Sequence, residues 1–468
     1  MSGTGDPDFV LQREIHVAPR KRAQLAQWLM EPAAAQGPFD QDTWRDTCRT
    51  RLYHSLLALC DLASEDLWPQ GRWREALQVW SDDGLILRSW RSTAPLVHKM
   101  PDDVLLELAP AVTWWLQAAS RSMDRHEAVM LDISGRLFDL PIKSSTGMSR
   151  NRRPADEPVD EAINHPIGHV TQALMNIWFA RRPNDDDLLP ADIERLFTRL
   201  CDKSVDRFRH GRVLLSINLI ALFRVDREWT ERNLLNLFDW AANPEEAKAV
   251  WKGFLWSPRL HHPLLAAFKS RFLSTVLHYA DLGEQARQFA SFLTYAALEP
   301  IDGYSSQDFQ TALAQLPIHG LQQSAQALSQ ALEGAGDQRE EYWTNRVAPF
   351  WHDVWPKSLS LATPEIAESL FRLALAAGHE FPAALATVKN WLRSVDHPFY
   401  IVHRLNESGL CEQFPRDALL LLDIVVDEPP YAPPDLKRCL DQIVRREPAI
   451  TQDARYRRLH EFWLRRST

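Results

Sequence analysis

Apolar residues recur at helical spacing along almost the whole of this chain, in segments of about 10 to 18 residues separated by short turns. Residues 41–63, for example, predict one helix with an apolar face at Leu52, Leu56 and Leu59. Runs that alternate apolar and polar residues, which are typical of strands, are few. We therefore expect an all-α protein without a sizeable β-sheet. Because the helices are short and closely spaced, an α-solenoid of degenerate HEAT-like helix pairs fits better than a bundle, although no strict sequence period is present.

Residues 213–223 are apolar on nearly every face of a helix, so we expect them to form a central helix that protein surrounds on all sides. This segment is much shorter than the roughly 20 residues that a helix needs to cross a bilayer. No other segment is apolar for long enough, and the N-terminus lacks the charged-then-apolar order of a signal peptide. We expect a cytoplasmic protein with no membrane contact.

The composition, with 45% hydrophobic and 25% charged residues, is that of an ordinary globular protein. A net charge of −9 argues against a general nucleic-acid-binding surface, because neutralising phosphates needs a basic excess. The five cysteines are scattered and form no CxxC, which predicts neither a disulfide framework nor a zinc module. The motifs GxGxxG, GxxxxGK followed by Ser or Thr, HExxH and GxSxG are also absent. We expect no cofactor and assign no catalytic residue.

Changes in composition divide the chain into four regions. Residues 1–140 are an N-terminal helical region, and residues 141–163, which are rich in Ser, Pro, Gly and charge, are predicted to be a linker or long exposed loop. Helical patterning resumes in a central helical repeat region, 164–300, and continues in a C-terminal helical repeat region, 301–468.

Arg209, His210 and Arg212 gather cationic donors at the start of the predicted central helix. A helix N-terminus already favours anions, and two arginines beside it could clamp a phosphate or carboxylate, or contact a partner. The same side chains could instead pair with acidic residues of the adjoining stretch, and we favour this ion-pair network. The acidic residues in reach are Asp226, Glu228 and Asp239.

Two pairs of histidines are candidates for metal ligands. His165 and His169 have the i, i+4 spacing that can place two imidazoles over one metal ion. A proline lies between them and no acidic or cysteine ligand stands at the usual positions, so the start of a helix is the simpler interpretation. His261 and His262 are likewise expected at a helix entry, because adjacent helical residues point in different directions. The sequence predicts no metal site.

The chain has 18 tryptophans against 8 tyrosines. Tryptophan buries a large surface and keeps one N–H donor, which suits both seams between helices and protein interfaces. Filling between helices is the interpretation we favour for most of them. Trp and Arg are also the side chains best able to anchor a partner, and the candidates for such a surface are Trp229, Trp251, Trp256 and Arg259.

Four stretches give the chain a resemblance to a known family: NHPIG at 164–168, RHGRVLL at 209–215, LFRVDREW at 222–229 and GFLWSPRL at 253–260. They resemble the helical C-terminal region, a domain of unknown function, of bacterial antiphage defence-associated sirtuin proteins. The similarity covers most of the chain and is firmest between residues 164 and 300.

In that family, an N-terminal sirtuin-like module degrades NAD when infection is sensed, and the helical region is assigned sensing or assembly. A sirtuin module needs a Rossmann-type site with glycine-rich turns, which this chain lacks. The resemblance therefore carries over no catalytic residue, and implies that any NAD-degrading module is supplied by another domain or subunit.

The expectation from sequence is a non-catalytic helical-repeat sensor or scaffold of a bacterial antiphage defence system, which binds a phage protein or an effector protein. Two alternatives stay open. One is an enzyme or nucleic-acid-processing factor with a basic site around Arg209, His210, Arg212 and His165. The other is a purely structural scaffold that assembles into homo-oligomers.

Overall fold

The computed structural model describes residues 17–31, 43–122, 126–142, 157–395, 397–427 and 431–466. Within these ranges every regular element is a helix and none is a strand, so the prediction of an all-α protein is confirmed. None of the described helices combines the length and the apolar character needed to cross a membrane.

The chain divides into two compact units, residues 1–254 and residues 255–468. This division falls inside the region 164–300 that was assigned from sequence. Residue 300 itself lies within the second unit, where α17 (Ala286–Leu298) packs against α19 (Ile318–Gly334).

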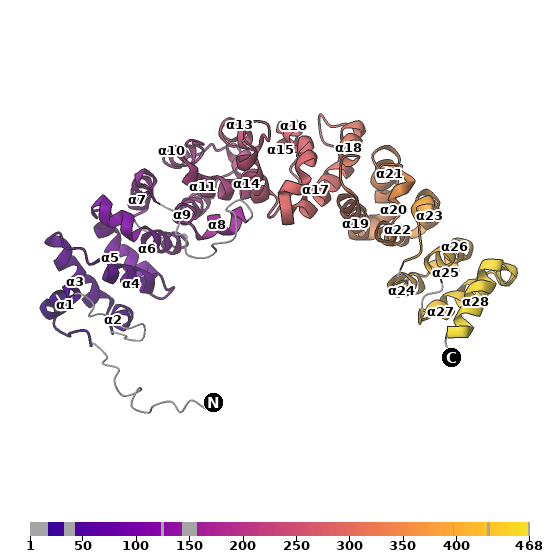
Figure 1. The fold of residues 1–468 in the computed structure, drawn as a ribbon, viewed down its shortest axis with the longest axis horizontal. Coiled ribbons are helices and arrows are strands. Elements are labelled where there is room, and N and C mark those ends of the chain that lie inside the picture. The colour runs from indigo at the N-terminus through magenta and orange to yellow at the C-terminus, as the bar shows by residue number, and fades with distance from the viewer. Residues whose placement is uncertain are drawn as a thin grey trace, which may run out of the picture. The chain divides into compact units, whose positions relative to one another are not determined.

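The helices of the first unit lie in two rows (Figure 1), and within a row each helix packs against the next. One row consists of α2 (Trp44–Thr50), α4 (Gln70–Trp80), α6 (Asp102–Ser120), α9 (Pro166–Ala180), α11 (Arg209–Ile217) and α14 (Pro244–Phe254). The other consists of α1 (Arg22–Met30), α3 (Leu52–Ser64), α5 (Ile86–Val97), α7 (Glu127–Asp139) and α10 (Ala191–Leu200). The remaining elements are α8 (Pro158–Asn164), η2 (Asp206–Phe208), α12 (Leu219–Val225), α13 (Arg227–Asn233) and η3 (Leu235–Phe238).

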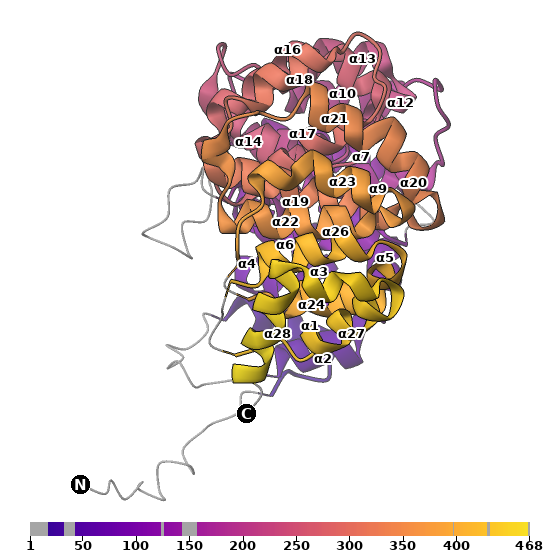
Figure 2. The same ribbon diagram turned by 90° about the vertical axis from the view of Figure 1, so that its right-hand side faces the viewer.

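The second unit repeats this pattern of neighbour packing. One row consists of α17, α19, α22 (Pro364–Ala376), α24 (Phe399–Glu407) and α27 (Leu436–Arg446). Beside it lie α16 (Lys269–Ser274), α18 (Ser306–Leu313) and α21 (Ala348–Asp353), followed by α23 (Phe381–Val388), α26 (Pro415–Val425) and α28 (Ala454–Arg466). Helices α26, α27 and α28 contact one another, and the turned view brings them to the front (Figure 2).

Shorter elements connect these helices of the second unit. They are α15 (His262–Ala267), η4 (Thr275–Gln285), η5 (Gly336–Gln338), α20 (Arg339–Tyr342), the π-helix η6 (Trp343–Val347), η7 (Leu359–Leu361), η8 (Gly378–Glu380), η9 (Lys389–Trp391), α25 (Leu410–Gln413) and η10 (Pro448–Gln452).

The apolar spacing of each helix decides which of its faces is buried. Helix α10 buries Ile193, Leu196, Phe197 and Leu200, which recur every three or four residues and so form one stripe. Its charged residues occupy the other faces. Burial of such a stripe contributes about 25 cal/mol per Å² of apolar surface, which is why short helices like these are stable only when they pack against one another.

The predicted central helix at residues 213–223 is two helices, α11 and α12, with a break at Asn218. The Asn218 side chain donates to the Leu214 carbonyl oxygen at 3.0 Å, and its backbone leaves the helical region with φ −101° and ψ 18°. Asparagine competes in this way with the backbone hydrogen bonds of a helix. The expected burial is present in α11, which packs against α8, α9 and α14 and exposes none of the residues from Gly211 to Ser216.

Part of the predicted linker, 141–163, is ordered structure. Its last residues belong to helix α8, where Val159 and Ala162 share a buried cluster with Val213 and Leu214 of α11. Residues 143–156 of the predicted linker lie outside the described residues.

Candidate functional site

Among the basic residues at the start of α11, Arg212 forms a buried ion pair with Glu246. The Arg212 side chain is almost fully buried and holds Glu246 of α14 with two hydrogen bonds, Nε to Oε1 at 2.6 Å and Nη2 to Oε2 at 2.9 Å. Its Nη1 group donates to the carbonyl oxygens of Leu200, at 3.1 Å, and Asp202, at 2.9 Å. Four of the five guanidinium N–H groups therefore have partners inside the protein.

Arg209 adds a second cation to Glu246, with Nε 3.2 Å from Oε2. Burial opposes ionisation of Glu246, but the hydrogen bond and positive charge of Arg212 outweigh it and hold the pKa of Glu246 below its usual value. The predicted ion-pair network is thus present around a different acid, because α14 packs on α11 and brings Glu246 to the arginines.

The three acids named from the sequence have other partners. Asp226 caps α13 through the Trp229 N–H, Glu228 pairs with Arg232, and Asp239 accepts from the Ala241 N–H. None of them contacts Arg209 or Arg212 in the described structure.

The histidines beside this ion pair are packed side chains. His165 caps α9 by accepting from the Ile167 N–H at 3.1 Å, so its prediction as a helix start is confirmed. Its ring stacks on that of His210, while Nδ1 of His169 lies 3.2 Å from the Thr113 hydroxyl. Burial lowers the pKa of His165 to about 3, and the pKa values of His169 and His210 to about 4. All three rings are neutral near pH 7.

These histidines do not converge on one point. The His165 ring faces His210, whereas the His169 ring makes a T-shaped contact with Trp114 at a centroid distance of 5.3 Å. Among the residues that the structure describes, no three His, Cys, Asp or Glu side chains are placed to hold a metal ion. His261 caps α15 by accepting from the Leu264 N–H, which confirms the predicted helix entry there.

Two of the four residues proposed for a partner surface lie inside the protein. Trp229 is buried and donates from Nε1 to the Thr198 hydroxyl at 2.8 Å, and Trp251 is buried with Nε1 donating to the Phe238 carbonyl oxygen at 3.1 Å. For these two the prediction is wrong, because their rings fill seams between helices.

Trp256 and Arg259 are exposed and lie in the second unit. The Trp256 side chain is 51% exposed, which is unusual for so large an apolar ring. Both residues belong to the loop between α14 and α15, and Pro258, between them, forms part of a pocket.

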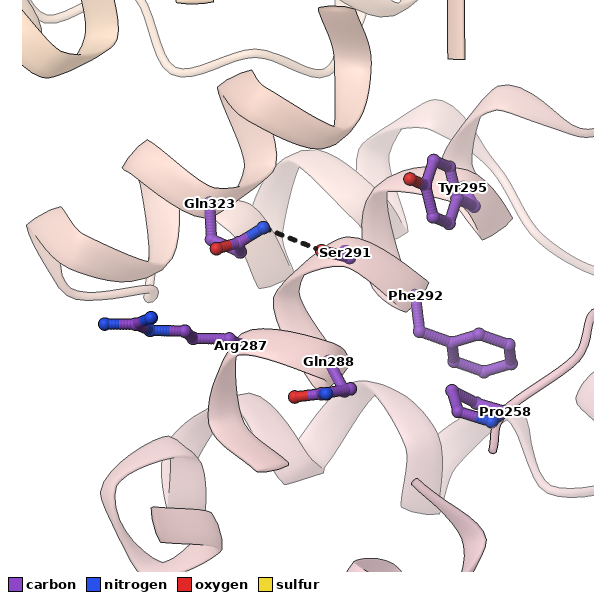
Figure 3. Close-up of a pocket in the computed structure, with 7 residues that line it drawn as sticks. All are labelled: Pro258, Arg287, Gln288, Ser291, Phe292, Tyr295 and Gln323. Carbon is purple, nitrogen blue, oxygen red and sulfur yellow. Dashed lines mark hydrogen bonds between the residues drawn. The ribbon is translucent and has the colours of Figure 1, made fainter. Parts of the chain in front are cut away.

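This pocket has a volume of about 360 Å³, and most of its wall comes from one face of α17 (Figure 3). Arg287 and Gln288 extend from the first turn of that helix, and Gln323 reaches in from α19. At the other end, the ring of Phe292 lies beside Pro258.

Hydrogen bonds between neighbouring helices hold the wall of the pocket. The Gln323 amide donates to the Ser291 hydroxyl at 3.1 Å, as the dashed line in Figure 3 marks. The Tyr295 hydroxyl donates to Gln330 at 3.4 Å, and burial raises the pKa of this phenol, so it stays a neutral donor. The two helices on which the pocket is built are therefore linked by hydrogen bonds.

The sequence did not predict Arg287, Gln288 and Gln323 as site residues. They belong to α17 and α19, which follow the loop of Trp256 later in the chain. One signal was available. Between residues 255 and 298 the only acids are Asp281 and Glu284, although the whole chain has more acidic than basic residues, 62 against 53. Such a stretch marks a part of the surface with a different charge from the rest.

Comparison with known proteins gives one distant relative and no family. The chain is 25% identical over 327 residues to the uncharacterized protein y4cA of Sinorhizobium fredii (strain NBRC 101917 / NGR234). The match covers 65% of this chain but 26% of y4cA, so the chain spans about a quarter of the length of that relative. No family model and no solved structure matches the chain.

Proposed function

We propose that this chain is a non-catalytic helical-repeat protein that binds another protein, and that it serves as a sensor or scaffold in bacterial antiphage defence. The architecture we propose for it is an α-solenoid of degenerate HEAT-like helix pairs. The neighbour packing of helices within each unit supports this proposal. Stacked helix pairs of that kind offer long surfaces suited to binding proteins.

One observation carries the binding role: Trp256 and Arg259 are exposed in the same loop as Pro258, which lines a pocket built on two packed helices. Tryptophan and arginine are the residues most often found at the centres of protein interfaces. A partner that covers the exposed half of the Trp256 ring would gain about 25 cal/mol for each Å² of apolar surface removed from water.

The defence role rests on the resemblance to the helical region of antiphage sirtuin proteins. The partner we propose is a phage component or a defence effector, met in the cytoplasm, and any NAD-degrading activity belongs to another domain or subunit. In y4cA, a region similar to this chain occupies about a quarter of a longer protein. That arrangement suits a module that works alongside other domains.

Affinity purification of the chain from infected cells tests the binding role. We expect a phage or host protein to copurify with the wild-type chain, and Trp256→Ala to reduce its recovery. Trp114→Ala is a matched control, because Trp114 is also 51% exposed but lies in the first unit. Equal recovery by the wild-type chain and Trp256→Ala would place the contact elsewhere, and recovery of no partner at all would count against a binding role.

Gene context tests the defence role independently. A sirtuin-like or other toxic effector encoded beside or fused to this chain supports it, whereas an isolated position among housekeeping genes argues against it. Light scattering separates the scaffold alternative, which predicts a large homo-oligomer of fixed size without any other ligand.

A further inference from the structure

The pocket between α17, α19 and Pro258 has two unlike ends. Arg287 supplies a cation and Gln288 an amide at one end, whereas the half-buried Pro258 ring, beside the buried Phe292 ring, forms an apolar surface at the other (Figure 3). A ligand that fits both ends carries an anionic group close to an apolar group. The volume of about 360 Å³ lies at the lower end of the range for ligand pockets, and suits a few side chains rather than a folded domain.

Charge favours an anion here. None of the residues that line the pocket is acidic. Within the part of the chain that the structure describes, neither Arg287 nor Arg259 forms an ion pair, and both are exposed. Lys269, by contrast, is already paired with Asp308 at 2.7 Å. In a chain whose net charge is −9, the unpaired Arg287 on the pocket wall creates a local positive potential.

We propose that this pocket binds an acidic, extended segment of a partner protein. A carboxylate of the segment pairs with Arg287 and accepts a hydrogen bond from the Gln288 amide, and a neighbouring apolar side chain rests on Pro258. The guanidinium group matches a carboxylate with two parallel N–H donors, which gives direction as well as attraction. The inference rests on the proposed function, because it names the chemistry of the partner.

Binding of designed peptides to the full chain tests the proposal. The probe is a fluorescein-labelled octapeptide with the central sequence Leu-Glu-Glu-Leu between Ser and Gly residues, and its counterpart has Lys in place of Glu. We expect the Glu peptide to bind the wild-type chain and to lose at least about tenfold in affinity with Arg287→Glu. The Lys peptide should prefer Arg287→Glu. Arg195→Glu, which reverses the charge of an exposed arginine in the first unit, should leave both affinities unchanged.

Two results would overturn the assignment of the pocket: equal affinity of the Glu peptide for the wild-type chain and for Arg287→Glu, or no binding up to about 1 mM peptide. The thermal midpoint of Arg287→Glu verifies that the variant is folded. If the purified chain still recovers a partner while the peptide fails, the binding role stands and the acidic-segment proposal falls. If the peptide binds as expected and no partner is recovered from cells, the pocket chemistry stands and the binding role falls.

Discussion

The rings of His165 and His210 stack with centroids 3.9 Å apart and planes 17° from parallel. The two residues come from the start of α9 and from α11, so the stack joins two helices of one row. Two neutral imidazoles can lie at this distance, whereas two imidazolium ions in a buried site would repel each other strongly.

We therefore expect stability to fall as the pH drops from about 6.5 toward 4. The folded pKa values, about 3 for His165 and about 4 for His210, lie below the value of about 6.5 for an unfolded histidine. The unfolded chain then binds more protons, and acid shifts the equilibrium toward it. Thermal midpoints at about pH 7 and pH 5 measure the slope. His210→Gln should reduce the dependence of the thermal midpoint on pH, whereas His352→Gln, at an exposed site, serves as the control and should not. Identical slopes in the wild-type chain and both variants would contradict this account.

Removing one partner of the buried ion pair should be costly. Glu246→Ala leaves the Arg212 charge buried without its acid, so we expect the free energy of unfolding to fall by about 3–5 kcal/mol. The double replacement Arg212→Met and Glu246→Leu should recover much of that loss, because both buried charges are gone. Urea denaturation compares them with Glu228→Ala, whose exposed pair with Arg232 is worth less than about 1 kcal/mol. Similar losses for the two alanine variants would contradict the importance of burial.

Close packing leaves no space for a side chain at Gly168. A Cβ atom there would lie 1.6 Å from the Ala162 carbonyl oxygen and 3.4 Å from a Leu214 methyl group. Because backbone atoms block the space, we expect Gly168→Ala to cost about 3 kcal/mol or more, at the upper end for overpacking. Gly71→Ala in α4 meets no atom within 4 Å and should be neutral or stabilising by up to about 1 kcal/mol. A stable Gly168→Ala protein would show that α8 can move away from α9.

The two kinds of tryptophan should respond differently to truncation. Trp229→Ala removes a buried ring and its bond to Thr198, so we expect a loss of about 3–5 kcal/mol in the free energy of unfolding. Trp256→Ala removes a half-exposed ring and should change that free energy by less than about 1 kcal/mol. Denaturant midpoints of the two variants provide the comparison. A large loss for Trp256→Ala would mean that its ring stabilises the fold itself.

Helical spacing was enough to predict the all-α fold, since buried stripes such as that of α10 recur every three or four residues. Short breaks were not predictable from it. Residues 41–63, expected as one helix, are interrupted at Arg51, where φ is −133° and ψ 53°. At Arg51 and Asn218 a single residue changes backbone conformation, while the apolar spacing on both sides still fits a helix.

The candidate site was harder to predict, because tertiary packing decides which residues meet. An ion pair for Arg212 followed from nearby acids, but the choice of Glu246 depends on α14 lying against α11. The burial of Trp229 depends likewise on α10, whose Phe197 packs against its ring and whose Thr198 accepts its hydrogen bond. The pocket that Pro258 lines draws most of its wall from α17 and α19, so no short stretch of sequence contains it.

Neighbour packing also has a consequence for how the chain is made. Within each unit the main helix contacts join elements close in the sequence, so few of them wait for distant segments to be synthesised. Residues up to 254 can complete their own compact unit while residues from 255 onward are still emerging from the ribosome. Each newly synthesised helix can pack against helices that precede it in the chain. The growing chain therefore exposes little apolar surface to other nascent proteins.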